Sequence, residues 1–395
     1  MFVFLKNTHI CYNSNMKNSF VLALSTLIGT IVGAGIFGLP YVVSRAGIIP
    51  SIFYFVVLGG VILVLHLCFG EIALRTKEKH RLIGYAQIYL GGWARGLATL
   101  STIGGVIGAL LVYMILAGNF LSLLLGAAFA DVESWVFSVA FWAVLSLVII
   151  LGIQTISRLA VVMNVALFCA VTVILIFAVP HVQVSNILLI SVENLFLPYG
   201  VVIFAFLGVS AIPEIADLFK NRQERRSLDN VIVWASVIVG LFYLVFATVI
   251  AGVSGLDTTP NALLGLKERI GDGIVLLGAF FGLVAISGPF VMLGNYLKNS
   301  LRYDYKIPRL AAIGFVTMVP LTLFLLGIRE FLSVVGIVGT LMGAVDGVLI
   351  VLIYLKAKSK GDRKPEYTLR LPKLVFFLVG AILVAGMVAE LAGKF

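Results

Sequence analysis

A glycine-rich stretch ending in a proline interrupts the first long apolar segment of the chain. The segment runs from about Phe20 to Val43, with four glycines within residues 29–38 and then Pro40. It is long enough to cross a bilayer as one helix. Each glycine costs about 1 kcal/mol relative to alanine in a helix interior, and the proline ring clashes with the carbonyl four residues earlier. In hydrocarbon a broken helix survives only against protein, water or a ligand. The stretch therefore predicts a discontinuous helix, parted near residues 33–35.

The residues of this stretch alone allow two interpretations. In a discontinuous helix, the amides that begin the second half would face an anion, because a helix N-terminus carries roughly +0.5 charge. Alternatively, Gly29 and Gly33 form a small-xxx-small pair of the kind found at close helix contacts. A similar feature further along the chain favours the break, since Gly208 precedes Pro213 by five residues, just as Gly35 precedes Pro40.

The composition identifies an all-α polytopic membrane protein. Of 395 residues, 61% are hydrophobic and 12% are charged, whereas a soluble domain carries about 25% charged residues. The three cysteines show no metal or disulfide spacing. Apolar windows predict about eleven transmembrane helices. We place them near residues 18–45, 49–74, 94–125, 134–152, 158–180, 194–219, 230–252, 272–297, 308–327, 330–355 and 372–391.

The basic residues predict the orientation of these spans. With the N-terminus cytoplasmic, 23 of the 28 Lys and Arg residues fall in cytoplasmic segments, as the positive-inside rule requires. An odd number of spans then places the C-terminus outside. The net charge of +10 is thus a topology signal, and we expect a multi-pass protein of the cell membrane, with the lipid bilayer and no nucleic acid as partner.

The two interrupted spans also predict an internal repeat. From Gly35 to Gly208 is 173 residues, or about five spans. Because five is odd, the second unit would be inserted upside down relative to the first, and paired interrupted helices in inverted halves mark the midplane site of a transporter. We expect a cytoplasmic tail over residues 1–17, five-helix units over 18–180 and 194–355, and a linker with the eleventh helix over 356–395.

These motifs resemble those of amino acid permeases of the APC superfamily. The run Gly33-Ala34-Gly35-Ile36-Phe37 with Pro40 is similar to the first-helix signature of that family. Residues 208–214, Gly-Val-Ser-Ala-Ile-Pro-Glu, resemble the sixth-helix break of the amino acid/auxin permease and aromatic amino acid permease branch. The resemblance covers nearly the whole chain. It implies a five-plus-five inverted-repeat (LeuT-like) fold, with an α-amino acid held between broken helices 1 and 6.

The resemblance also implies the residues that bind the substrate. The carboxylate would meet amides of the first break and the ammonium would meet carbonyls near both breaks, so that each half-helix dipole is matched by one charge of the zwitterion. The implied set is Ile28, Gly29, Gly33, Ala34, Gly35, Tyr113, Phe204, Phe206, Leu207 and Gly208. This surround is apolar apart from Glu214, which favours neutral substrates, large or aromatic ones among them.

Four polar residues are candidates for coupling or gating. Asp346 lies near the middle of the tenth span, where an acid costs roughly 2.5–3.5 kcal/mol. It is either a proton-coupling carboxylate or a buried acid bonded to a neighbouring helix, and Glu214 is a second candidate. Sodium-coupled relatives use hydroxyls on the eighth helix, where this chain has only Ser287. Some proton-coupled relatives carry a lysine in the fifth helix, where this chain has only Asn164. The coupling ion is H+ or Na+, with H+ slightly favoured, and no cofactor is expected.

Together these features predict a secondary active symporter of neutral amino acids that works by alternating access. The alternatives are a membrane-embedded enzyme that uses His66, Glu71 or Asp346, and a channel or sensor on the same fold. The sequence contains no P-loop, no HExxH and no Ser-His-Asp set, so we do not expect an enzyme. No pattern indicates the exact amino acid or the oligomeric state.

Overall fold

The described part of the chain is helical throughout. The computed structural model describes residues 14–126, 128–129, 131–151 and 156–392, and these contain no strand. The first half comprises α1 (Ser14–Ile31), α2 (Gly35–Ala46), α3 (Ile48–Arg75), α4 (Leu82–Leu90), α5 (Gly92–Leu125), α6 (Ser134–Leu151) and α7 (Ile156–Ala178). The second half comprises α8 (Pro198–Phe206), α9 (Ala211–Leu218), α10 (Arg222–Arg225), α11 (Leu228–Ser254), α12 (Lys267–Ile270), α13 (Asp272–Tyr305), α14 (Arg309–Leu325), α15 (Phe331–Ile337), α16 (Gly343–Lys360) and α17 (Lys373–Leu391). Single turns of 3₁₀ helix lie at Val179–His181, Val184–Asn186, Gly255–Asp257 and Leu264–Leu266.

Each predicted span coincides with one of these helices or with an adjoining set of them. Among the described residues, seven helical segments are long and apolar enough to cross a membrane, and the bent pair α1–α2 makes an eighth. The other three predicted spans fall on shorter apolar helices within α7, α14 and α17. The expectation of a polytopic helical membrane protein is therefore confirmed.

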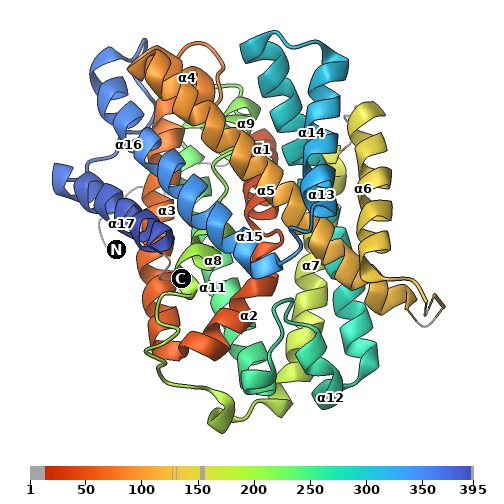
Figure 1. The fold of residues 1–395 in the computed structure, drawn as a ribbon. Coiled ribbons are helices and arrows are strands. Elements are labelled where there is room, and N and C mark those ends of the chain that lie inside the picture. The colour runs from red at the N-terminus through yellow and green to blue at the C-terminus, as the bar shows by residue number, and fades with distance from the viewer. Residues whose placement is uncertain (1–13, 127, 130, 152–155, 393–395) are drawn as a thin grey trace.

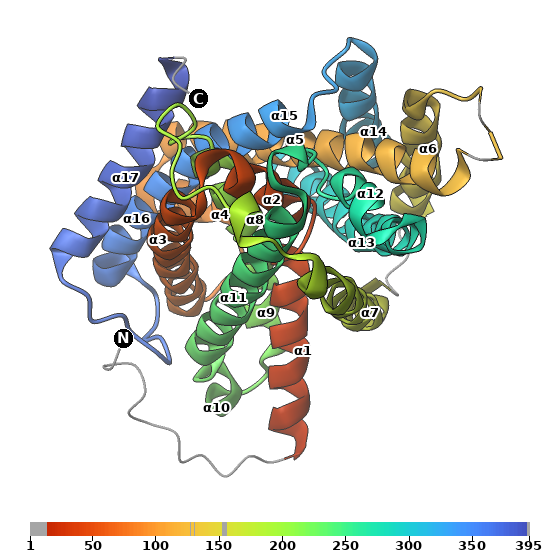
Figure 2. The same ribbon diagram turned by 90° about the horizontal axis from the view of Figure 1, so that it is seen from below.

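The two interrupted spans lie in the middle of the helix assembly. Figure 2 shows α2 and α8 near the centre, with α17 and α6 at opposite margins. Helix α2 packs against α8 and α11, and α8 also packs against α3. Figure 1 shows α4 and α12 at opposite ends of the molecule. The central position of α2 and α8 explains why the breaks are tolerated, since their backbone groups face protein rather than lipid.

The second, third and fourth spans have similar helix lengths in the two halves. Helices α3 and α11 have 28 and 27 residues, α5 and α13 both have 34, and α6 and α14 have 18 and 17. A short helix precedes the long one in each half, α4 before α5 and α12 before α13. This is the pattern that two five-span units of common design would give.

The tenth span contains a local irregularity. A π-helical turn at Val338–Met342 separates α15 from α16. Such turns are frequent at functional sites. Asp346 follows within the first turn of α16, so the irregular turn helps to set the direction of its side chain.

Candidate functional site

The first span is broken where the glycines predicted it. Helix α1 ends at Ile31 and α2 begins at Gly35, with a bend of 54° between them. The Gly33 amide donates to the Ile31 carbonyl at 3.0 Å, which closes the end of α1. The first amides of α2 have no acceptor within their own helix, and no side chain caps them. The positive end of α2 is therefore available to an anion.

The second break is straighter than the first. Helix α8 ends at Phe206 and α9 begins at Ala211, and the two halves form a segment whose bend does not exceed 40°. Leu207 has an extended backbone, with φ of −63° and ψ of 118°. Pro213 lies in the first turn of α9, as the sequence predicted, because proline lacks only an amide that is unpaired there in any case.

A cavity of about 470 Å³ lies between the two breaks. Nine of the residues singled out from the sequence line it: Gly29, Gly33, Ala34, Gly35, Tyr113, Phe204, Leu207, Glu214 and Asp346. The cavity continues past Leu22 and Thr26 of α1 and past Leu218 of α9 to Leu82 of α4. It therefore extends from the breaks toward the end of the molecule that carries α4.

Between the breaks and the end of the molecule that carries α12, side chains pack tightly. A Cβ atom on Gly35 would lie 2.5 Å from the Cα of Ala205, so α2 and α8 are in backbone contact. The Phe37 and Phe120 rings meet edge to face, with centroids 4.8 Å apart. Gly38 faces Val201 at the next level. The cavity is thus closed toward the end that carries α12.

Five of the residues singled out from the sequence are not among the lining residues. Ile28 is buried and its carbonyl accepts the Val32 amide at 2.7 Å. The Phe206 ring packs edge to face against Phe55. The Ser287 hydroxyl donates to the Leu283 carbonyl of its own helix at 2.6 Å.

The remaining two are Gly208 and Asn164. Gly208 packs behind the cavity, where an added Cβ would lie 2.5 Å from Ile31 Cγ1. Asn164 lies on α7, but its side chain is outside the part of the chain that the structure describes.

Two acidic residues line the cavity: Asp346, which has no charged partner among the described residues, and Glu214, which has one. Asp346 lines the cavity, and its Oδ1 has no hydrogen-bond partner among the described residues. Glu214, nearer the α4 end, forms an ion pair with Arg81. Neither lysine nor arginine is among the described lining residues. The cavity is consequently suited to guests without a net negative charge.

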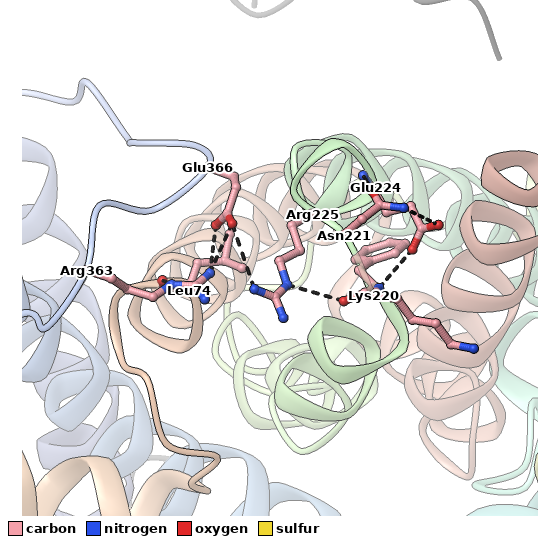
Figure 3. Close-up of polar contacts among 8 residues, drawn as sticks. Leu74, Lys220, Asn221, Glu224, Arg225, Arg363 and Glu366 are labelled. Carbon is pink, nitrogen blue, oxygen red and sulfur yellow. Dashed lines mark hydrogen bonds and ion pairs between the residues drawn. The ribbon is translucent and has the colours of Figure 1, made fainter. Parts of the chain in front are cut away.

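A polar network secures the backbone at the α4 end of the molecule (Figure 3). Glu366, in the linker between α16 and α17, bonds Arg363 at 2.9 Å and lies 3.9 Å from Arg225. Arg363 also donates to the Leu74 carbonyl at the end of α3. Glu224 accepts the Lys220 amide at 2.8 Å, just before α10. These contacts fasten the linker to the end of α3 and to α10, which follows α9.

Two buried residues that no sequence motif marked contact the breaks directly. The His66 Nε2 atom accepts the Gly208 amide at 3.2 Å. The Tyr243 hydroxyl lies 2.9 Å from the Ile31 carbonyl and 3.1 Å from that of Ala205. Their partners are main-chain groups far away in sequence, so only their polarity within an apolar helix could have pointed to them.

Comparisons with known proteins agree with this architecture. The family model described as transmembrane amino acid transporter protein matches residues 16–392. Curated relatives named neutral amino acid transporter 9, from Xenopus tropicalis and Xenopus laevis, are each 28% identical over 111 residues. This alignment covers 27% of the present chain and 20% of each relative, so the match spans about a fifth of the relatives' length.

A solved structure matches over nearly the whole chain. It is the crystal structure of MhsT in complex with L-phenylalanine, with a TM-score of 0.70 and 15% sequence identity. The match covers 95% of this chain and 98% of that chain. At this identity the likeness concerns the fold, and it confirms the predicted LeuT-like architecture.

Proposed function

The chain belongs to the transmembrane amino acid transporter protein family, and we propose that it is an ion-coupled secondary transporter of neutral amino acids that works by alternating access. The strongest support for this proposal is the position of the cavity. The cavity of about 470 Å³ lies where two central helices are interrupted, so that main-chain groups of both breaks are available to a guest. Its volume falls within the range of about 300–1,000 Å³ typical of small-molecule sites.

The two charges of an amino acid match the two kinds of helix end in the cavity. The substrate carboxylate would bind the amides that begin α2, near Ala34 and Gly35. The ammonium would bind the carbonyls of Gly29, Thr30 and Leu207. These three residues line the cavity, and their carbonyls have no recorded donor among the described residues. Each helix end carries about half a unit charge, so a zwitterion is matched at both ends.

A neutral substrate side chain is supported by the rest of the lining. Most lining residues are apolar, and Glu214 is already paired with Arg81. A relative carries the name neutral amino acid transporter, and the structural neighbour was crystallised with L-phenylalanine. Both descriptions support a neutral substrate, and the volume leaves room for a large or aromatic side chain.

Asp346 is the proposed site of proton coupling. Asp346 lines the cavity, and its Oδ1 is buried without a hydrogen-bond partner among the described residues. An ionised acid in the bilayer costs roughly 2.5–3.5 kcal/mol. Binding a proton removes that cost, which would link protonation to closure of the cavity. Ser287 of α13 is not among the described residues that line the cavity, so the lining offers no support for a sodium site at that residue.

The direction in which the cavity extends supports an inward-facing state. It runs toward the α4 end, where Lys77, Lys79, Arg81 and Arg363 gather. Basic residues concentrate on the cytoplasmic side of membrane proteins. We infer that the cytoplasm is the compartment that this cavity faces.

Uptake into proteoliposomes tests the proposal. A panel of radiolabelled amino acids is offered under an imposed proton gradient, an imposed sodium gradient, or neither. We expect neutral amino acids to accumulate only under the inward proton gradient. Asp346→Asn should abolish accumulation but retain exchange of internal for external substrate, whereas Asp257→Asn, an exposed acid, should behave as wild type. Accumulation driven by sodium alone would contradict proton coupling, and uptake of no amino acid would contradict the function.

A further inference from the structure

His66 holds the second break by an unusual bond. It lies on α3, its side chain is fully buried, and its Nε2 accepts the Gly208 amide at 3.2 Å. This bond requires the neutral tautomer with the hydrogen on Nδ1, an atom that is buried without a hydrogen-bond partner among the described residues. Without this acceptor, the Gly208 amide would have no recorded partner in the described residues. A histidine thus takes the place of the helical carbonyl that the break removes.

Tyr243 contacts the main chain at both breaks. It lies on α11 and is also fully buried. Its hydroxyl is 2.9 Å from the Ile31 carbonyl, the last of α1, and 3.1 Å from the Ala205 carbonyl near the end of α8. Both of these helix ends carry about −0.5 charge. One shared hydroxyl hydrogen between them offsets a repulsion that would otherwise drive the half-helices apart.

The two contacts are related by the repeat. Helices α3 and α11 are the second spans of their respective units. From His66 to Tyr243 is 177 residues, against 173 from Gly35 to Gly208, so the two side chains lie within about one helical turn of equivalent positions. Each side chain reaches the break of the opposite unit, His66 to Gly208 and Tyr243 to Ile31. The breaks also touch each other, since Gly208 packs on the Ile31 side chain.

We propose that His66 and Tyr243 are positioning residues, which brace the two breaks against each other from behind the cavity. They hold the ends of α1 and α8 and the extended segment at residue 208 at a fixed separation, while the opposite faces of the breaks bind the substrate. Neither residue lines the cavity, so they act through the backbone and not by contact with substrate. The consequence for binding rests on the proposed function, but the bracing itself does not.

Hydrogen–deuterium exchange of the ligand-free protein tests the bracing alone. Tyr243→Phe removes only the hydroxyl, and His66→Leu removes the acceptor. We expect exchange to accelerate by about tenfold over residues 31–35 and 207–211 in each variant, because each contact spans both units. His66→Gln supplies an acceptor near the position of Nε2 and should restore slow exchange at Gly208.

Binding and transport kinetics test the positioning role. With each variant purified, the Kd of a radiolabelled neutral amino acid should rise by about three- to tenfold for Tyr243→Phe and His66→Leu. The KM should rise in parallel, while kcat changes by less than about twofold. His66→Gln should bind as wild type does. Tyr89→Phe is the matched control, because it removes a buried hydroxyl that bonds Thr76 at 2.7 Å within the α3–α4 region.

The outcomes separate the bracing from the function. If exchange at both breaks is unchanged in Tyr243→Phe and His66→Leu, or if His66→Gln exchanges as fast as His66→Leu, the bracing is refuted. If exchange accelerates but Kd matches that of Tyr89→Phe, the positioning role is refuted. If the wild type binds no amino acid, the proposed function fails while the exchange result still decides the bracing. Should His66→Leu not fold, Tyr243→Phe carries both tests.

Discussion

The backbone contact between Gly35 and Ala205 makes Gly35→Ala a quantitative test of the site. A methyl group at residue 35 would lie 2.5 Å from the Ala205 Cα and 2.7 Å from its Cβ, whereas carbon atoms in good contact are about 3.5–4.0 Å apart. The helices α2 and α8 must therefore separate by about 1 Å. Backbone atoms cannot rotate away as a side chain can, and overpacking of this kind costs about 1–3 kcal/mol.

This strain falls at the centre of the proposed binding site. Separating α2 from α8 moves the amides that begin α2 away from the carbonyls near the end of α8. If the whole strain opposes substrate binding, kcat/KM should fall by about 5- to 150-fold, since 1.4 kcal/mol corresponds to a factor of ten. Thermal unfolding should also occur at a lower temperature than in the wild type.

Proteoliposome uptake and equilibrium binding measure the effect. Gly60→Ala is the matched control, because a Cβ at that position meets no atom within 4 Å, and it should transport as the wild type does. Gly35 is not among the glycines with a positive φ, so alanine is compatible with its backbone conformation and a loss of activity cannot come from the backbone preference. Wild-type kinetics in Gly35→Ala would refute a rigid contact between α2 and α8.

Three further substitutions test other parts of the structure. Ser287→Ala should leave KM and the response to sodium unchanged, because Ser287 is not among the described residues that line the cavity; a lost sodium response in uptake assays would show that the hydroxyl binds the ion. Arg81→Gln removes a partly exposed ion pair with Glu214, worth at most about 1 kcal/mol, so uptake should change by less than about fivefold, and abolished uptake would reveal a larger role. Glu366→Gln should lower the stability by about 1–3 kcal/mol, because Glu366 is 7% exposed and pairs with Arg363. Thermal unfolding and hydrogen exchange over residues 361–372 would measure this loss of stability. Unchanged exchange in that linker would contradict the role of Glu366 in holding it.

The helices and their breaks could be predicted because local residues dictate them. Apolar length fixes the spans, and the glycines before Pro40 and Pro213 leave the helices unable to continue unbroken. The break near residue 33 was located to within a residue or two of the observed gap between Ile31 and Gly35. Asp346 could be singled out because an acid is costly in a bilayer, and the structure places it in the cavity.

The supports behind the breaks could not be predicted in the same way. His66 and Tyr243 bond main-chain groups that lie 142 and 212 positions away in sequence, and a main-chain partner leaves no residue signature. The aromatic ring of Phe206 was assigned to the pocket because of its place beside the break, but α8 turns it toward Phe55. The direction of a side chain around a short half-helix depends on packing between the two units, which local patterns do not encode.

The one-sided extent of the cavity has a practical consequence for inhibitor design. A membrane-impermeant compound that fills the space between Leu82 and the first break could enter only from the α4 end in this conformation, since Phe37 and Phe120 close the opposite route. In vesicles that contain both orientations, such a compound added to the bath would silence only those molecules whose α4 end faces outward. The fraction of activity that survives would then report how the population is oriented, without any label on the protein.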